Sequence, residues 1–417
     1  MKVLFLCGGI GKRMFPLTED KFLLKFLGKT LIEHQLDTAV KSGLNRFIIV
    51  ANPVNLTRIE NIASQYQNAE FEFIVQEKPL GIANAVEKAR HLLKEEVLLV
   101  NPNDIFENTA YVNLLESHKK DKTAAFITGC KVKNYFPGGY LVVNEQGRLT
   151  RIMEKPGPGN EPSDMVNILV HLHSDPETLL HYISQVKTNH DDVYEQAVDA
   201  MCLDHCAIQV VPYTGAWTPI KYPWHVLDAV RYFLDRAETK ISPDVLISSH
   251  AVLDGKVIIE DGVKILENAV IRGPAYIGRN TVIGNNALVR TYSHLGSDCV
   301  VGFSTEIKES YVGDGTQFHM SYAGDSVIGA HCSFGAGTTT ANWRFDTKNI
   351  KVKIGDSLVD TGRDKLGAFI GDNCRTGIQV GIMPGVRIGN NALIYPHVNL
   401  TNDVGVDTIV HSQSPSR

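Results

Sequence analysis

The stretch Ile277-Gly278-Arg279-Asn280-Thr281-Val282-Ile283-Gly284-Asn285-Asn286-Ala287 decides the fold of the second half of this chain. An apolar residue recurs there at every sixth position. The repeated position is occupied by Ile259, Ile265, Ile271, Ile277 and Ile283, and the same spacing recurs at Ile370, Thr376, Ile382, Ile388 and Ile394. A period of six that persists this long is typical of a parallel β-helix, in which each repeat forms one face of a coil and points one apolar side chain inward.

Two interruptions of this repeat are candidate functional sites, because solenoids carry function in their insertions. The first runs from Phe318 to Asp325 and contains His319, and the second runs from Thr340 to about Lys365. An imidazole can take the proton that an amine loses when it attacks a thioester. A single histidine in a solenoid can equally be a structural hydrogen bonder, and the residues alone leave both interpretations open.

The first half of the chain alternates short apolar runs with helical patterns, which predicts a mainly parallel sheet flanked by helices. The predicted strands are Val3 to Cys7, Phe47 to Val50, Phe71 to Val75, Val97 to Val100 and Ala124 to Cys130. A predicted helix over Thr30 to Lys41 ends at Ser42-Gly43. Another helical pattern follows Trp224 and reaches about Lys240. We therefore expect two domains, over residues 1–235 and 236–417.

The loop Gly8-Gly9-Ile10-Gly11-Lys12-Arg13 follows the first predicted strand. Its glycines allow the backbone N–H groups to approach anionic oxygens, and the basic residues add positive charge. It matches neither the dinucleotide-binding pattern nor the GxxxxGK[ST] phosphate loop. Phosphate binding and a plain turn after a buried strand both remain open on this loop alone.

Polar residues also follow the later strands, where ligands of open α/β sheets bind. Gln76 could read a base edge beside Gly81, or be an exposed residue of a Pro-Gly turn. Asp104 could hold Mg²⁺ or cap the next helix. Glu154 and Asn167, near Gly139, could bind sugar hydroxyls, or Glu154 and the following lysine could form a surface pair.

Composition bounds the function. With 417 residues, a net charge of −5 and 43% hydrophobic residues, the chain is expected to be globular, with no electrostatic case for nucleic acid and no membrane partner. The apolar run of Val3 to Leu6 is too short for a signal segment or a membrane span. Seven scattered cysteines predict a reducing, cytoplasmic compartment. Only Cys202, His205 and Cys206 cluster, and we expect them on a helix and not at zinc.

Five motifs in order make the first half resemble the sugar-1-phosphate nucleotidylyltransferases. They are Gly8 to Thr18, Gly28 to His34, Gln76 with Pro79-Leu80-Gly81, Asp104, and Glu154-Lys155-Pro156. The resemblance implies a Rossmann-like domain that joins a nucleoside triphosphate to a sugar 1-phosphate and releases pyrophosphate. It also implies that Gly8, Gly9 and Gly11 cradle the triphosphate, that Arg13 and Lys21 neutralise charge at the α-phosphorus, and that Asp104 holds Mg²⁺.

The sequence departs from that family at three places. The spacer before Lys21 is short, so Lys25 is a rival for the catalytic lysine. Asn167-Ile168-Leu169 replaces an Asn-x-Gly element of the sugar pocket. Pro219 stands where many members have a metal-binding aspartate, which leaves the second metal ligand unassigned, with Asp228 the nearest carboxylate.

The second half is similar to hexapeptide-repeat acyltransferases, whose β-helices are left-handed and usually form trimers. Its closer resemblance is to the acetyltransferase half of bifunctional glucosamine-1-phosphate acetyltransferase/N-acetylglucosamine-1-phosphate uridylyltransferase enzymes. That resemblance implies His319 as general base. It implies an amino-sugar phosphate site at Arg290, Lys308, Tyr322, Asn342 and Lys348, with Ser333 near the thioester in place of a common asparagine.

We therefore expect an enzyme that acetylates glucosamine 1-phosphate with acetyl-CoA and then couples the product to UTP, as a homotrimer acting on small molecules. Two alternatives remain at this point. One is a nucleotidylyltransferase for another sugar nucleotide with a purely structural β-helix, and the other is a non-catalytic regulatory subunit on the same two domains.

Overall fold

The computed structural model describes residues 1–411, which form two compact units. The first unit comprises residues 1–10, 20–23 and 30–219, and the second comprises residues 11–19, 24–29 and 220–417, of which the last six are not described. The boundary predicted from sequence lies after residue 235, whereas the compact second unit takes up the chain from residue 220.

The first unit is built on a nine-stranded mixed sheet. The strands, in spatial order, are β10 (Leu149–Glu154), β9 (Gly139–Val143), β11 (Met165–His173), β6 (Val97–Val100), β1 (Lys2–Cys7), β4 (Arg46–Ala51) and β5 (Glu70–Val75), with β8 (Ala125–Lys131) on β11 and β12 (Ile208–Tyr213) on β8. Strands β6, β1, β4 and β5 are parallel, and β11 runs antiparallel to β6. All five predicted strands are confirmed.

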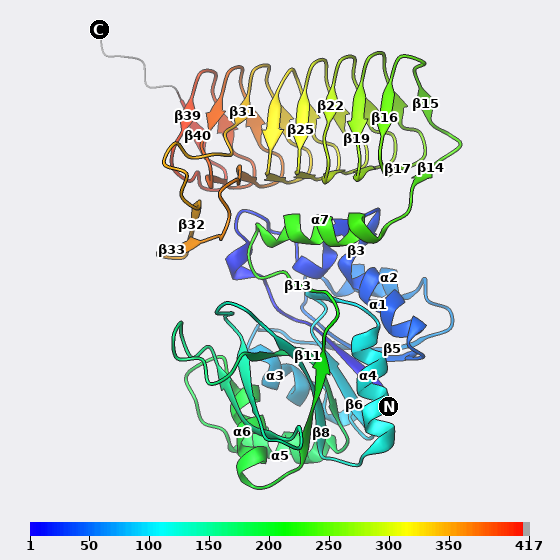
Figure 1. Ribbon diagram of the computed structural model, residues 1–417, viewed down its shortest axis with the longest axis vertical. Helices are drawn as coiled ribbons and strands as arrows, with labels where there is room; N and C mark the ends of the chain where they lie inside the picture. Colours follow the sequence, from blue (N-terminus) through cyan, green and yellow to red (C-terminus); the bar gives the residue numbers. More distant parts are fainter. Residues whose placement is uncertain (412–417) are drawn as a thin grey trace. The chain divides into compact units, whose positions relative to one another are not determined.

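Helices cover both faces of this sheet (Figure 1). They are α1 (Leu31–Lys41), α2 (Leu56–Ala63), α3 (Gly81–Lys88), α4 (Thr109–Lys120), α5 (Pro176–Gln185) and α6 (Val193–Leu203), with short 3₁₀ turns η2 (Lys21–Leu23) and η3 (Arg90–Leu92). Alternate residues of β1 enter opposite cores, with Val3 and Phe5 on one face and Leu4 on the other. The predicted first helix is confirmed: Thr30 and Glu33 form a capping box, and Gly43 follows its end with φ +85°.

The first unit also contains a short second sheet, and its cysteines are not paired. Strands β7 (Asp104–Phe106) and β13 (Trp217–Pro219) form an antiparallel pair outside the main sheet. Cys202 lies on α6, as expected. His205 and Cys206 follow the end of that helix, so the expectation of a helix is wrong for these two residues; His205 has φ +62°, which α-helical backbone does not adopt. No cluster of three metal-binding side chains occurs among residues 1–411. All seven cysteines are free thiols.

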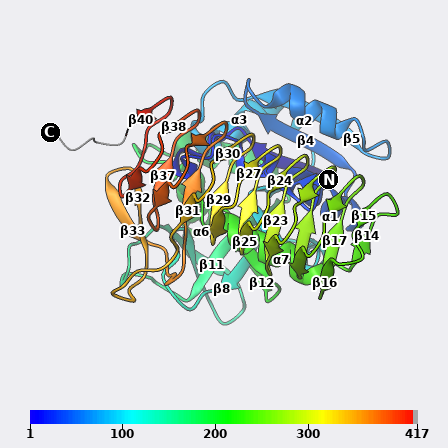
Figure 2. The ribbon, with the colours of Figure 1, turned by 90° about the horizontal axis from the view of Figure 1, so that it is seen from above.

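The second unit contains three parallel stacks of short strands that fit a left-handed β-helix of hexapeptide repeats (Figure 2). The first stack contains β14 (Lys240–Ile241), β17 (Val257–Ile259), β20 (Ala275–Ile277), β23 (Ser293–Leu295), β26 (Tyr311–Val312), β29 (Val327–Ile328), β34 (Phe369–Ile370) and β37 (Arg387–Ile388). The second contains β15 (Leu246–Ile247), β18 (Lys264–Ile265), β21 (Val282–Ile283), β24 (Val300–Val301), β27 (Gln317–Phe318), β30 (Ser333–Phe334), β35 (Arg375–Thr376), β38 (Leu393–Ile394) and β40 (Ile409–Val410). The third contains β16 (Val252–Asp254), β19 (Val270–Arg272), β22 (Leu288–Val289), β25 (Glu306–Lys308), β28 (Tyr322–Gly324), β31 (Thr339–Thr340), β36 (Gly381–Ile382) and β39 (Asn399–Leu400).

The register of these stacks confirms the six-residue period. Ile265 pairs with Ile283, and Ile283 pairs with Val301, so side chains one full coil apart stack inside the helix. The predicted isoleucines form its buried core, in which Ile265, Ile277 and Ile283 are almost wholly removed from water. Burying each such side chain is worth roughly 1.5–3 kcal/mol relative to exposure.

Both predicted interruptions are present. The coil between β27 and β28 is shortened at His319 and Met320, and Met320 has φ +39°. The second interruption leaves the stack after β31, forms the hairpin of β32 (Lys351–Ile354) and β33 (Ser357–Asp360), and returns where Leu366 N–H donates to the Asn342 carbonyl. Figure 1 shows this hairpin projecting from the later coils.

The helix after Trp224 is shorter than predicted. It is α7 (His225–Arg236), and Lys240 and Ile241 instead form β14. The reason is strand pairing: β14 pairs with β17, so these residues begin the β-helix and cannot continue the α-helix. In the part of the chain that the structure describes, none of the helices combines the length and the apolarity that a bilayer span requires.

Candidate active sites

Gly8 and Gln76 are brought together at the carboxyl ends of β1 and β5. A Cβ added to Gly8 would lie 2.0 Å from Gln76 Oε1, so any larger residue would have to displace the Gln76 side chain. The Gln76 amide is 4% exposed, and its Nε2 donates to Asn84 Oδ1 at 3.0 Å and to the Gly81 carbonyl at 3.1 Å. The alternative of an exposed turn glutamine is therefore wrong, because this amide is buried and held in one orientation.

Asp104 begins β7 and is largely buried. It does not cap α4, whose N-cap residue is Asn108, so the capping alternative is wrong. The β13–β7 register places Pro219 directly opposite Asp104. A second carboxylate at position 219 would have faced Asp104, and proline removes that possible ligand.

The predicted sugar-binding residues meet on neighbouring strands. A Cβ on Gly139 would lie 3.0 Å from Asn167 Oδ1, and Glu154 is the strand partner of Gly139. The Lys155 ammonium lies 2.6 Å from the Glu154 carboxylate, and Lys155 has φ +46°. The pair of Glu154 and Lys155 that was the alternative to sugar binding is therefore present. It is not a fully exposed surface pair, because only 15% of the Glu154 side chain is exposed.

Glu195 is a residue of this region that sequence reasoning missed. It lies in the first turn of α6 and is almost fully buried. Burial, assisted by the negative charge of Glu154, raises the pKa of Glu195 to about 8. No local motif marks it, because its burial comes from the packing of α6 against the strand that carries Glu154.

The basic residues predicted to neutralise phosphate lie on segments of different units. Gly11 has φ +56° and precedes the 3₁₀ turn η1 (Lys12–Met14) of the second unit, in which Arg13 is exposed. Lys21 begins η2 in the first unit. Its rival Lys25, in the short strand β2 (Lys25–Phe26) of the second unit, has its ammonium 2.7 Å from Asp314.

The segment before Lys21 is fixed by a second missed group. Asn55 Nδ2 donates to Asp20 Oδ2 at 2.7 Å and to the Cys7 carbonyl at 3.0 Å. Asn55 is buried, and it thus ties the end of β1 to Asp20. This contact joins three segments that are distant in sequence, so no spacing could have indicated it.

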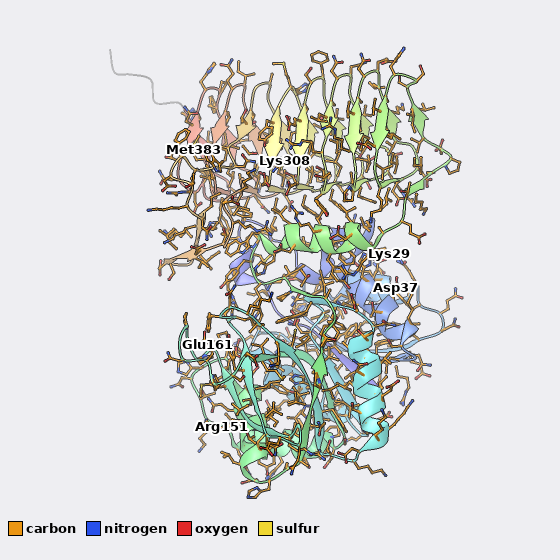
Figure 3. The ribbon with its side chains drawn as sticks, viewed as in Figure 1. Lys29, Asp37, Arg151, Glu161, Lys308 and Met383 are labelled. Carbon is orange, nitrogen blue, oxygen red and sulfur yellow. The ribbon has the colours of Figure 1, made fainter. Side chains whose placement is uncertain are left out.

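In the β-helix, a polar network connects five residues of adjacent coils. Asn342 Nδ2 donates to Tyr322 Oη at 3.1 Å and also to the Asp325 carboxylate. Lys308 Nζ donates to both Asp325 oxygens, at 3.0 and 2.8 Å, and lies 3.2 Å from Glu309. Figure 3 labels Lys308 within the middle coils of the stack. Sequence reasoning named Lys308, Tyr322 and Asn342 but missed Asp325, the carboxylate that holds them together.

The cations of this site are compensated by carboxylates. Burial lowers the pKa of Lys308, but its hydrogen bond and attraction to Asp325 outweigh this effect, and the net shift is upward. Arg290 Nη1 donates to Glu306 Oε1 at 2.8 Å, which raises the Arg290 pKa. Lys308 and Arg290 therefore remain charged but already have anionic partners.

His319 lies at the shortened coil and is exposed. Its backbone is fixed, since its N–H donates to the Phe334 carbonyl at 3.0 Å and its carbonyl accepts from Ser321 Oγ at 2.8 Å. Within residues 1–411 its imidazole has no hydrogen-bond partner, which does not fit a structural hydrogen bonder. Ser333 lies in β30 and is partly exposed, and Lys348 is exposed on the second interruption.

The donor set around Asp104 fits Mg²⁺ that is completed by substrate. Mg²⁺ is commonly held by one or two carboxylates together with water and phosphate oxygens. Asp104 supplies one carboxylate, and Pro219 supplies none. Asp228 lies on α7 and forms an ion pair with Arg363, so it has a different partner.

Each half of the chain matches a known protein family. Residues 2–217 match the Nucleotidyl transferase family, and residues 256–291 and 367–402 match the Bacterial transferase hexapeptide (six repeats) family. A crystal structure of UDP-glucose pyrophosphorylase complexed with UDP-glucose covers 57% of this chain and 99% of its own, with a TM-score of 0.50 and 16% identity. That similarity supports the fold.

Whole-chain relatives carry both domains. Bifunctional protein GlmU of Methanococcus maripaludis strain C7 is 38% identical, over 99% of this chain and 98% of the relative. Bifunctional sugar-1-phosphate nucleotidylyltransferase/acetyltransferase of Sulfurisphaera tokodaii is 34% identical over 97% and 98%, and GlmU of Methanocaldococcus jannaschii is 33% identical over 99% and 98%. The chain belongs to the family of bifunctional sugar-1-phosphate nucleotidylyltransferase/acetyltransferases.

Proposed function

We propose that this enzyme makes UDP-N-acetylglucosamine in two steps. The β-helix transfers the acetyl group of acetyl-CoA to glucosamine 1-phosphate, and the first domain couples N-acetylglucosamine 1-phosphate to UTP. The observation that carries the proposal is the exposed, unpartnered imidazole of His319, three residues before Tyr322 of the Tyr322–Asn342 network, on a chain whose family is bifunctional.

Acetyl transfer needs a base at the incoming nitrogen. The amine attacks the thioester carbonyl, the new C–N bond forms, and the C–S bond breaks. His319 accepts the proton that the nitrogen loses, and this proton can return to the departing thiolate. Tyr322 and Asn342 offer a hydroxyl and an amide oxygen to the sugar, while Asp325 holds the Asn342 amide in place.

Arg290, Lys308 and Lys348 support a phosphorylated acceptor in this site. Three cations near one acyl acceptor are hard to explain for a neutral sugar. Because Lys308 and Arg290 already face carboxylates, exposed Lys348 would supply the largest uncompensated charge to the phosphate. Ser333 would lie beside the thioester.

Nucleotidyl transfer needs charge compensation more than an acid or a base. A phosphate oxygen of the sugar attacks the α-phosphorus, a new P–O bond forms, and the bond to pyrophosphate breaks. Arg13 and Lys21 would offset the negative charge that these groups bring together, and Gly8, Gly9 and Gly11 would present backbone N–H groups to the triphosphate.

Substrate recognition in the first domain rests on three further groups. Both N–H groups of Gln76 Nε2 are used by Asn84 and Gly81, so Gln76 would read uracil through Oε1, which would accept from the N3–H of the base. Glu154 and Asn167 would bind the sugar hydroxyls and the N-acetyl group beside Gly139. Mg²⁺ at Asp104 would neutralise the phosphates when bound.

We further propose a homotrimer assembled through the β-helix, in the cytoplasm. The hexapeptide repeats support the first point, and the seven free thiols support the second. Light scattering on the purified protein would give three times the chain mass if the trimer forms.

Two assays test the proposed activities. Pyrophosphate release is measured with N-acetylglucosamine 1-phosphate and UTP, and free-thiol release is measured with glucosamine 1-phosphate and acetyl-CoA. We expect both products. Release of pyrophosphate without release of thiol would support a nucleotidylyltransferase with a structural β-helix. If neither product is released with any of a panel of sugar phosphates and nucleotides, the protein is not an enzyme of this class.

A further inference from the structure

Two segments near the start of the chain fold as part of the β-helix unit. They are residues 11–19, which include Arg13, and residues 24–29, which directly follow the turn of Lys21. Each segment is anchored by side chains of the β-helix coils.

Residues 11–19 are anchored by the later coils. Asn390 Nδ2 donates to Thr18 Oγ1 at 2.9 Å. The Arg387 guanidinium lies 5.1 Å from the centre of the Phe15 ring, and Asp403 orients that guanidinium through hydrogen bonds of 3.1 and 2.7 Å. A Cβ on Gly371 would lie 3.1 Å from the Pro16 carbonyl oxygen, so the loop backbone approaches this coil closely.

Residues 24–29 are anchored by the middle coils. Lys25 Nζ lies 2.7 Å from Asp314 Oδ2, while Asp314 Oδ1 accepts from the Ser297 N–H at 2.9 Å. The Leu27 N–H donates to His294 Nε2 at 3.1 Å. Between these two contacts, the ring of Phe26 is fully buried, with the Tyr311 ring centre 5.9 Å away.

We infer that Asn390, Arg387 and Asp314 are positioning residues for nucleotidyl transfer. The inference rests on the proposed function, in which Arg13 and Lys21 act at the α-phosphorus. Arg13 belongs to the anchored segment 11–19, and Lys21 lies between the two anchored segments in the sequence. A displacement of about 1 Å in a catalytic group can cost about 100-fold in rate.

The contacts are suited to positioning and contribute little to stability. The Lys25–Asp314 pair is exposed by 46% and 32% at its two side chains, and such pairs contribute roughly 0–1 kcal/mol. The Asn390–Thr18 bond is also exposed. Their loss should therefore leave the β-helix folded while freeing the loop, so activity and stability should respond differently.

The first test compares Asn390→Ala with Asn285→Ala. The two asparagines follow a glycine at the same repeat position, but the Asn285 amide donates to Glu267 of the preceding coil and not to the loop. We expect Asn390→Ala to lower kcat of pyrophosphate release 10-fold or more, with unchanged KM for N-acetylglucosamine 1-phosphate and unchanged thiol release. Its melting temperature should fall slightly, because Asn390 Oδ1 also accepts from the Asp372 N–H at 3.0 Å within the β-helix. Thr18→Val leaves that bond in place and should keep the wild-type melting temperature. Asn285→Ala should leave both activities at the wild-type level.

Thr18→Val, alone and combined with Asn390→Ala, completes a double-mutant cycle, because it removes the same hydrogen bond from the loop side. The double variant should be no slower than the slower single variant. Three results would each overturn the inference. They are a double variant whose rate loss is the product of the two single losses, an Asn390→Ala enzyme with the wild-type rate of pyrophosphate release, and an equal loss of pyrophosphate and thiol release. If the wild-type protein itself releases no pyrophosphate, the proposed function has failed instead.

A charge-removing pair of variants tests the second anchor. Asp314→Asn removes the charge that faces Lys25 but keeps a carbonyl oxygen for the Ser297 N–H, and Lys25→Met removes the ammonium. Each should slow pyrophosphate release, and the double variant should be no slower than the slower single variant. A normal rate in Asp314→Asn together with a slow Lys25→Met enzyme would overturn the role assigned to Asp314 and would instead point to direct phosphate binding by Lys25.

Discussion

In the β-helix, residues that touch lie one coil apart in the sequence, whereas in the nucleotidyl-transfer domain they come from distant segments. Ile265, Ile283 and Val301 stack in succession. In the first domain, Gly8 leaves room for the Gln76 side chain, and Gly139 lies close to the Asn167 side chain. Local contacts leave a period in the sequence, and distant contacts leave isolated residues whose partners appear only after folding.

The difference extends to the active sites. The acetyl-transfer residues lie on neighbouring coils, so their network is closed by a few short hydrogen bonds around Asp325. The residues proposed for nucleotidyl transfer lie mostly at the ends of separate strands of the first unit, and residues 11–19 cluster with the β-helix in the second unit. The two sites should therefore respond separately to changes in their own catalytic residues.

The largest expected effect separates the two sites by their chemistry. His319→Ala should lower thiol release by about 10²–10⁴-fold, because the amine loses its proton acceptor, and should leave pyrophosphate release unchanged. Asp104→Ala should have the reciprocal effect. Steady-state rates of both products from each variant check this prediction, and loss of both activities in His319→Ala would indicate damage to the fold.

The next effect tests the periodic core. Ile283→Ala removes a fully buried side chain that stacks on both neighbouring coils, and should cost about 2–5 kcal/mol of unfolding free energy. Denaturant unfolding measures it. Val282→Ala, at the adjacent and less buried position of β21, is the matched control and should cost less; equal costs would contradict the inward assignment of Ile283.

A smaller effect tests a distant contact. Gly8→Ala should push Gln76 out of its hydrogen bonds, because the added Cβ would lie 2.0 Å from Oε1, and should reduce nucleotidyl transfer about 10- to 100-fold. Gly9 has no atom within 4 Å of an added Cβ, so Gly9→Ala should not lower the melting temperature. A normal UTP affinity in Gly8→Ala would show that Gln76 does not read the base.

The smallest effect concerns pH. The pKa of Glu195 is about 8 in the folded protein, above its ordinary value, so the folded state holds a proton that the unfolded state releases. Stability from this group is present at low pH and is lost as pH rises from about 4.5 to about 8, by at most about 1.4 kcal/mol per pH unit.

Glu195→Gln should remove this slope, since glutamine does not titrate. Unfolding free energies of the variant and the wild-type protein between pH 5 and pH 8, about the range of the titration, provide the comparison. An unchanged slope would assign the pH dependence to other groups. His173, whose burial lowers its pKa to about 3, acts with the opposite sign and destabilises the fold as pH falls below about 6.5.

Sequence reasoning predicted the periodic half nearly residue by residue, because a solenoid repeats one environment. It predicted five strands of the first sheet but extended α7 into β14, because helix periodicity does not reveal where strand pairing takes over. Candidate site residues that stand in motifs, such as Gln76 and His319, could be proposed from the sequence, and their roles stay predictions. Asn55, Glu195 and Asp325 could not, since their roles come from packing between segments.

The most direct test of the account is a single reaction that contains wild-type protein, glucosamine 1-phosphate, acetyl-CoA, UTP and Mg²⁺, followed by mass spectrometry of the nucleotide sugars. The account predicts UDP-N-acetylglucosamine, preceded by N-acetylglucosamine 1-phosphate. Accumulation of unacetylated UDP-glucosamine, or of N-acetylglucosamine 1-phosphate with no nucleotide sugar, would contradict it.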